Sequence, residues 1–196
     1  MNRFRRVWAA FFIAACSGGL FAGAAAASVK VEVPIPPRAA AGVIFYAPTA
    51  WNEQKPDSRL KLFQFEVPSP DPAFQNGQME VLYFGPNKGG TVQSHVDRWK
   101  AEFTETDRGF PPVSDMRTVN GLRVTTVQIE GIYQSTMPGA DRLPKKDWAV
   151  AGAIVEGPEG LLFFKMSGPV VTVRSARPVF DMMTSNIRRE KPVPQP

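Results

Sequence analysis

A tight turn in the middle of the chain constrains its fold more than any other feature of the sequence. Asn120 and Gly121 stand between two runs rich in β-forming residues, 116–119 and 122–133. Asn-Gly is the pair most typical of a two-residue β-hairpin, because both positions need a positive φ. A second glycine-containing turn, at 157–160, lies between two further runs of this kind. Hairpins in series predict a mainly antiparallel sheet.

One segment has helical periodicity instead. Val92, Val96, Trp99 and Phe103 are spaced by four, three and four residues, which predicts one apolar helix stripe. Thr91 directly precedes the stripe and is suited to cap the start of the helix. We therefore expect Trp99 and Phe103 to be buried against the sheet.

A second helix is expected near the C-terminus. Its apolar stripe runs from Ala176 through Val179 to Ile187, and Pro178 is expected in or near the first turn, because proline kinks a helix interior. Together with the strands, this gives the order β-β-β-α-β-β-β-β-α. We interpret it as an α+β fold, a mainly antiparallel β-sheet with two packed α-helices. The expected strands are 43–46, 59–67, 79–84, 116–119, 122–133, 148–156 and 161–167.

The N-terminus, residues 1–27, has the pattern of a secretory signal peptide. Three arginines in the first six residues precede an uncharged stretch, 7–27, that ends in small residues. Cleavage after this stretch would release a chain that begins at Ser28. The pattern predicts export to the periplasm or cell envelope, or secretion.

Cys16 offers a second way to process the same segment. Residues 13–16 resemble a bacterial lipobox, in which a signal of residues 1–15 is removed and the cysteine is lipidated. The apolar run continues to Ala27, whereas lipoprotein tethers usually turn polar. We therefore favour simple cleavage, with Cys16 as a small apolar residue of the signal.

The rest of the chain divides into three parts. A proline-containing linker is expected at 28–41, a single α+β domain at 42–189 and a proline-rich tail at 190–196. Without the signal arginines the chain carries 20 basic and 18 acidic residues, a net charge of +2. This near balance, without an arginine-rich stretch, disfavours a nucleic-acid partner.

Few residues could carry catalysis or bind a metal. The chain has one cysteine and one histidine, which excludes an internal disulfide framework and the usual structural zinc sites. His95 lies one position off the helical stripe, so we expect it at the boundary or the surface. Glu102, Glu105 and Asp107 lack the spacing of a calcium loop, and we expect them at a solvated helix end. We expect no catalytic residue, metal or cofactor.

Two segments are candidates for contact with a partner. Residues 85–91 lead into a helix, whose free N–H groups could attract an anion together with Lys88. Gly90 occupies the place where a phosphate-binding P-loop needs its lysine. The second segment, 134–147, is longer than a hairpin needs and could meet an anionic partner or lipid headgroups. Its candidate contact residues are Met137, Arg142, Lys145 and Lys146. A structural turn and a solvated loop are the simpler interpretations.

Several segments resemble exported PsbP-like and DcrB-like domains. Pro48 and Trp51 follow a short early strand, and a late strand ending at 163–168 leads into a helix with Phe180 and 185–187. Segments within 89–103, 120–127 and 152–158 resemble a group of uncharacterised exported bacterial proteins. The resemblance implies a PsbP-like α/β/α sandwich. It also implies a non-enzymatic envelope or lumenal protein that assists or binds something else.

The leading hypothesis is an exported, non-enzymatic accessory or binding domain of the bacterial envelope. Its partner would be an envelope protein or a membrane surface, and only the signal or a lipid anchor would enter the membrane. A small-molecule carrier and a hydrolase with scattered carboxylates are the alternatives. A perturbed carboxylate in a polar cleft would favour the enzyme. A large dry apolar pocket would favour the carrier. An exposed apolar patch would favour the protein-binding domain.

Overall fold

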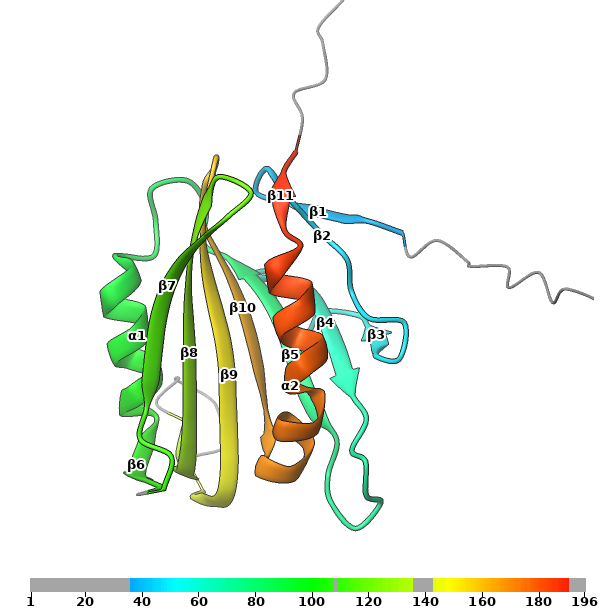
Figure 1. The fold of residues 1–196 in the computed structure, drawn as a ribbon, viewed down its shortest axis with the longest axis vertical. Helices are drawn as coiled ribbons and strands as arrows, with labels where there is room; N and C mark the ends of the chain where they lie inside the picture. The colour runs from blue at the N-terminus through cyan, green and yellow to red at the C-terminus, as the bar shows by residue number, and fades with distance from the viewer. Residues whose placement is uncertain (1–35, 108, 136–142, 191–196) are drawn as a thin grey trace, which may run out of the picture. The chain divides into compact units, whose positions relative to one another are not determined.

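The computed structural model describes residues 36–107, 109–135 and 143–190 (Figure 1). The signal peptide of 1–27, its alternative of 1–15 and Cys16 therefore lie outside the described residues. Within the described part of the chain, neither helix is both long and apolar enough to cross a membrane.

A large sheet of eight strands forms the centre of the domain. The strand order is β3-β4-β5-β10-β9-β8-β6, with β7 also paired to β8, and every pairing is antiparallel. The strands are β3 (Asn52–Gln54), β4 (Lys61–Val67), β5 (Gly77–Tyr83), β6 (Phe103–Thr106), β7 (Val113–Val119), β8 (Leu122–Tyr133), β9 (Lys145–Gly157) and β10 (Gly160–Pro169). The expected antiparallel sheet is confirmed.

A small second sheet joins the two ends of the domain. β2 (Val43–Phe45) pairs with β1 (Arg38–Ala40) on one side and with β11 (Arg188–Arg189) on the other. The expected linker of 28–41 is therefore wrong at its C-terminal end, because β1 belongs to the folded domain. β1 has only three residues. An alternating pattern of that length cannot be recognised in a segment rich in proline and alanine.

Helix α1 (Val92–Ala101) covers one face of the large sheet. Val96 and Trp99 pack there against Val127 and Ile129 of β8, and against Phe163 of β10. The expected burial of Trp99 and Phe103 is confirmed, with 5% and 7% of their surfaces exposed. Phe103, however, is the first residue of β6 and not part of the helix, which ends at Ala101.

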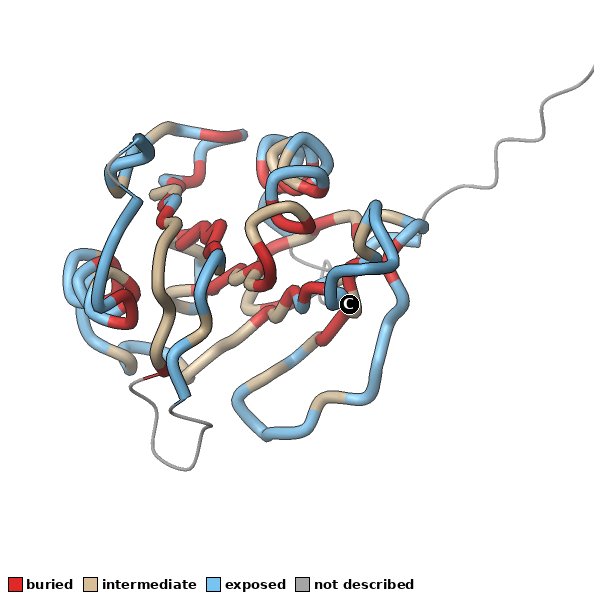
Figure 2. Tube along the Cα trace, turned by 90° about the horizontal axis from the view of Figure 1, so that it is seen from below, coloured by how far each residue is buried: buried red, intermediate tan, exposed pale blue. Residues whose placement is uncertain are grey.

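Helix α2 (Val170–Ser185) and the small sheet cover the opposite face. Phe180 of the helix and Phe45 of β2 are fully buried there, and Phe45 meets Phe164 of β10 edge-on with ring centroids 5.1 Å apart. Phe163 and Phe164 thus face opposite helices. Figure 2 shows the resulting three layers, with buried positions along the sheet and on the inner sides of both helices.

Both expected hairpins are present. Asn120 and Gly121 have φ angles of 47° and 77°, as a two-residue hairpin turn requires, and Val119 pairs with Leu122. Gly157 and Gly160 likewise pair at the start of the β9–β10 ladder. The α+β fold with a mainly antiparallel sheet and two packed helices is confirmed, in an α/β/α arrangement.

The position of Pro178 differs from the expectation. The second helix begins at Val170, eight residues before Pro178, so the proline lies in its interior. All four residues of 170–173 are β-branched, which is more typical of a strand and concealed the start of the helix. Pro178 is exposed, so the carbonyl of Arg174 that loses its N–H partner lies on the side that faces water.

Candidate functional site

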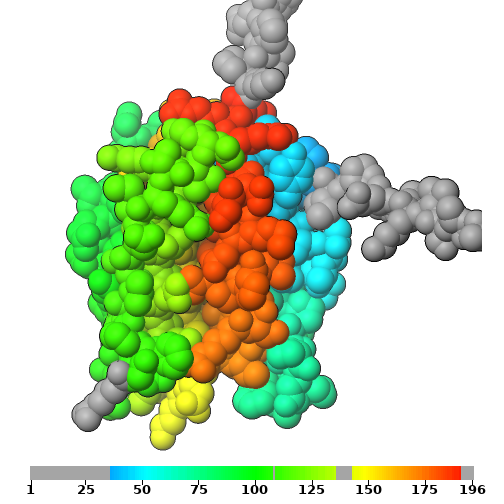
Figure 3. Space-filling view, in the orientation of Figure 1, coloured from blue at the N-terminus to red at the C-terminus, as the bar shows by residue number. Residues whose placement is uncertain are grey.

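A surface groove runs along the C-terminal half of α2. One wall is the loop that follows β2, with Tyr46, Pro48 and Ala50, and the other wall is the helix itself, with Val179 and Met182. The groove has a volume of about 770 Å³. We call it the α2 groove. α2 occupies the middle of the face shown in Figure 3, with the N-terminal strands on one side and β7 on the other.

The outward side of α2 explains why the groove is apolar. Val179 and Met182 are exposed to 37% and 64%, and Pro178, Ser175 and Ser185 on the same side are also exposed and uncharged. The buried side of the helix is apolar as well, from Val173 through Phe180 to Met183. Val179 and Met182 therefore add exposed apolar side chains to a helix whose inner side is already buried.

The charged residues of α2 lie along its flank and are paired within the domain. Arg174 donates two hydrogen bonds to the Glu130 carboxylate, at 3.0 and 2.6 Å. Arg177 forms an ion pair with Asp181 at 2.8 Å. These pairs leave the outer stripe of the helix without charge.

One end of the groove carries a cation. Arg188 is exposed and donates a hydrogen bond to the Tyr46 hydroxyl at 2.7 Å, with its guanidinium 5.4 Å from the centroid of the Tyr46 ring. Among the described residues that line the groove, Arg188 is the one charged group and none is acidic. The groove is thus suited to an apolar segment that also carries a carboxylate.

The sequence had placed Val179 in the buried stripe, and the structure corrects this. The buried stripe is formed by Ala176, Phe180 and Met183, which leaves Val179 and Met182 beside it on the outer side. Two large apolar residues next to an already complete stripe were the signal that could have revealed the groove. The facing loop could not be paired with them, because it lies some 130 positions earlier in the chain.

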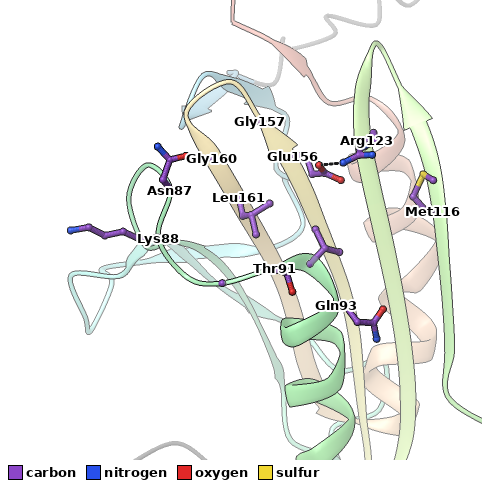
Figure 4. A pocket seen from close by; sticks show the side chains of 12 residues that line it. Asn87, Lys88, Thr91, Gln93, Met116, Arg123, Glu156, Gly157, Gly160 and Leu161 are labelled. Carbon is purple, nitrogen blue, oxygen red and sulfur yellow. Dashed lines mark hydrogen bonds and ion pairs between the residues drawn. The ribbon is translucent and has the colours of Figure 1, made fainter.

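Lys88 lies at a different place, near the β9–β10 hairpin (Figure 4). The hollow there has a volume of about 660 Å³, and its main charged feature is an ion pair between Arg123 and Glu156. Lys88 points away from these side chains. Thr91 and Ser94 form a capping box at the start of α1, in which each side chain accepts from the backbone N–H of the other at 3.1 Å. Two of the N–H groups that could have attracted an anion are therefore used.

The lysines expected in the long loop belong to a strand. β9 begins at Lys145, so Lys145 and Lys146 are strand residues and not loop residues. They line a hollow of about 1040 Å³ at the far end of β9 from Lys88, and the structure does not bring the three lysines together. Met137 and Arg142 lie outside the described residues.

His95 is buried, contrary to the expectation of a boundary or surface position. Only 2% of its surface is exposed, and its ring lies between Phe84 and Phe163, with centroids 5.8 and 4.3 Å away. Its Nε2 donates to the carbonyl of Gly89. Burial lowers the pKa of His95. A neutral ring fixed by aromatic neighbours stabilises the loop before α1, and it faces no cavity described above.

Glu102 is also buried, so the expectation of a solvated helix end is wrong at this residue. Its carboxylate forms an ion pair of 2.6 Å with Lys165 of β10, and the side chains are 2% and 14% exposed. Burial and the charge of Glu102 raise the pKa of Tyr133 to about 12. Glu105 and Asp107 are exposed, as expected.

The buried ion pair does not form a recognisable catalytic site. Glu102 and Lys165 compensate each other's charge, and they line none of the three hollows described above. Within residues 36–107, 109–135 and 143–190, no three histidine, cysteine, aspartate or glutamate side chains are grouped so that they could hold a metal ion.

Compared by sequence, the chain matches no protein-family model and no curated protein. By structure it is similar to the cyanobacterial PsbP protein (CyanoP) of Synechocystis sp. PCC 6803, with a TM-score of 0.48 and 14% identity over 76% of this chain and 87% of that chain. It is also similar to PA94 of Pseudomonas aeruginosa, a protein of unknown function, with a TM-score of 0.45 and 10% identity over 82% of this chain and 97% of that chain. A PsbP protein is thus among the solved structures that this chain resembles.

Proposed function

We propose that this protein is an exported, non-enzymatic binding domain of the bacterial envelope. Its α2 groove would hold an apolar segment of another envelope protein. The single observation that carries the proposal is the uncharged outer stripe of α2, with Met182 64% exposed. Exposed apolar patches of this kind mark sites of protein–protein interaction.

The shape and charge of the groove also indicate which kind of segment would fit it. An amphipathic helix or an extended peptide can place apolar side chains between the loop after β2 and α2. A carboxylate on the same segment would meet Arg188, which has no acidic neighbour among the described lining residues. We expect one apolar segment with an acidic residue at one end.

The two alternative functions have weaker support. A carrier would enclose its ligand in a pocket that buries most of it, whereas Met182 and Val179 are exposed at the surface. A hydrolase would need a carboxylate that is free to act, whereas buried Glu102 is paired with Lys165. The proposal therefore keeps the non-enzymatic role that the sequence had suggested.

Photo-crosslinking in living cells tests the binding proposal. p-Benzoylphenylalanine in place of Met182 is expected to cross-link to an apolar segment of another envelope protein, identified by mass spectrometry of the joined peptides. Arg188→Glu in the same chain is expected to lower the yield at least five-fold. The matched control is the same substitution at Phe74, which is 46% exposed in the β4–β5 loop. Cross-linking at Met182 that is no stronger than at Phe74, or that joins only lipid, would refute the proposal.

Export is tested separately by the mature N-terminus. Sequencing of the protein isolated from the envelope is expected to begin at Ser28, which leaves no cysteine in the chain. Palmitate labelling that is lost in Cys16→Ser would instead establish the lipoprotein form, since stable anchoring needs two or more acyl chains. An N-terminus at Met1 in the cytoplasmic fraction would contradict export itself.

A further inference from the structure

β7 lies at an edge of the large sheet. It pairs with β8 over seven consecutive residues, from Val113 opposite Gln128 to Val119 opposite Leu122, without a register shift. No other described strand pairs with it. Met116, at its centre, is 58% exposed, and Val113 is 50% exposed. Edge strands are usually protected by proline, a bulge or an inward-pointing charge. β7 contains neither a proline nor a bulge, and its one half-buried charge is Arg117.

The turn at Asn120 and Gly121 determines which backbone groups of β7 remain unpaired. Residues that flank a two-residue hairpin turn exchange hydrogen bonds, and in an antiparallel ladder such pairs alternate with pairs that do not. Counting back from Val119, the N–H and C=O groups of Ser114, Met116 and Thr118 point away from β8. These three residues offer six backbone groups to a further strand.

Apart from Asp115 and Arg117, which exchange places, the sequence of β7 is chemically similar when it is read from either end. It runs Val, Ser, Asp, Met, Arg, Thr, Val, so that valine faces valine and a hydroxyl faces a hydroxyl when the strand pairs with an antiparallel copy of itself. We propose that two copies of this chain dimerise through β7, with a two-fold axis at Met116. The proposal is independent of the function proposed for the α2 groove.

Charge selects this register over its neighbours. When Met116 lies opposite Met116 of the second copy, Asp115 lies opposite Arg117 of that copy. By symmetry, Arg117 lies opposite Asp115 of the second copy. A register with its axis at Asp115 would place two carboxylates opposite each other. A register with its axis at Arg117 would place two guanidinium groups opposite each other. Opposite charges across strands stabilise a sheet, whereas like charges directly opposite destabilise it.

Arg117 supplies a second, independent observation. Its side chain is half-buried on the α2 face, where one terminal nitrogen donates to Thr184 Oγ1 at 3.3 Å. Its Nε is buried without a hydrogen-bond partner. Among the described residues neither Arg117 nor the exposed Asp115 takes part in an ion pair. The self-paired register would bring a carboxylate to each of these guanidinium groups.

A charge exchange tests the register. Every variant is produced from the full-length sequence with Cys16→Ser, and the dimer dissociation constant is measured by sedimentation. Asp115→Arg and Arg117→Asp are each expected to weaken the dimer at least ten-fold, because like charges then face each other. The double variant, which exchanges the two charges, is expected to return to within three-fold of the parent. A parent that is monomeric at 100 µM, or a double variant no tighter than the single ones, would overturn the proposal.

A disulfide test locates the axis without relying on charge. Facing residues in a hydrogen-bonded antiparallel pair have Cα atoms about 5.5 Å apart, within the range that a disulfide spans. In the Cys16→Ser background, Met116→Cys is expected to form a cross-linked dimer at least ten times faster than Met182→Cys. Met182 is the matched control because it is comparably exposed, at 64% against 58%. Equal rates for the two thiols would rule out an axis at Met116.

Discussion

On the α2 face of the large sheet the core is extensive and mainly apolar, with Thr172 and Thr184 buried among its apolar residues. On the α1 face the core is smaller and includes His95 and Glu102. The α2 face buries Phe45, Phe164 and Phe180 among many aliphatic residues. The α1 face has a ten-residue helix that buries His95, and the ion pair between buried Glu102 and partly buried Lys165 lies next to it.

The difference explains how α2 can carry exposed apolar side chains. The large core holds α2 mainly through its inner side, so apolar side chains can remain exposed on its outer side. α1 is shorter and buries only His95, Val96 and Trp99. Its approach to β9 depends on Gly152, where a Cβ would lie 2.2 Å from Trp99 Cζ3.

The largest effect is expected at the centre of the α1 face. Trp99→Ala should lower the free energy of unfolding by about 3–5 kcal/mol, because it removes a large buried aromatic side chain and leaves a cavity. Urea unfolding of the variant measures this loss, and Met182→Ser on the outer side of α2 serves as the control, with a change within about 0.5 kcal/mol. Similar midpoints for the two variants would contradict the contrast between the faces.

The buried ion pair should give the next largest effect. Glu102→Leu and Lys165→Met each leave one charge without its partner, and we expect each to lower the free energy of unfolding by roughly 2–3 kcal/mol. The value lies below that for a fully buried pair because Lys165 is 14% exposed. The double variant should recover most of the loss, since replacing both charges by apolar groups removes the unpaired charge. A strictly additive double variant would show that the two charges do not interact.

The smallest effect concerns the pH dependence of stability. Burial lowers the pKa of His95 in the folded state, so the unfolded chain binds more protons near its ordinary pKa of about 6.5. The contribution of the neutral ring is therefore present above about pH 6.5 and is lost as the pH falls toward the folded-state pKa. The slope cannot exceed about 1.4 kcal/mol per pH unit for one proton.

Since His95 is the one histidine of the chain, a single substitution isolates this dependence. Unfolding measured between pH 7.5 and 5.5 should show falling stability for the parent chain. His95→Phe should give a flatter profile over the same range. An unchanged slope in the variant would assign the pH dependence to other groups.

Local sequence signals predicted the parts of the fold that are formed by local contacts. The turn at Asn120 and Gly121 and the cap at Thr91 lie within a few residues of the elements they define, and both are confirmed. The burial of Trp99 followed from a stripe within one helix. The short strands β3 and β11, by contrast, depend on partners that no local pattern reveals.

The residues that were misjudged all depend on distant neighbours. His95 is buried because Phe163 comes to it from β10, and Glu102 is buried because Lys165 reaches it from the same strand. The α2 groove likewise needs the loop after β2, which meets the helix only in the folded domain. From their polarity alone, His95 and Glu102 were expected to be exposed to solvent. Their contacts with Phe163 and Lys165 offset the free-energy cost of burying them.

The position of β2 has a consequence for the order in which the domain is completed. Ile44 is paired with Ala39 on one side and with Arg188, 144 positions later, on the other. A ribosome must therefore release nearly the whole chain before β11 can close the small sheet. Pairing across so long a loop is slow, because the entropy of loop closure precedes the gain from contact. A nascent chain can form the central hairpins early, but the small sheet of β1 and β2 is completed only after β11 has been synthesised.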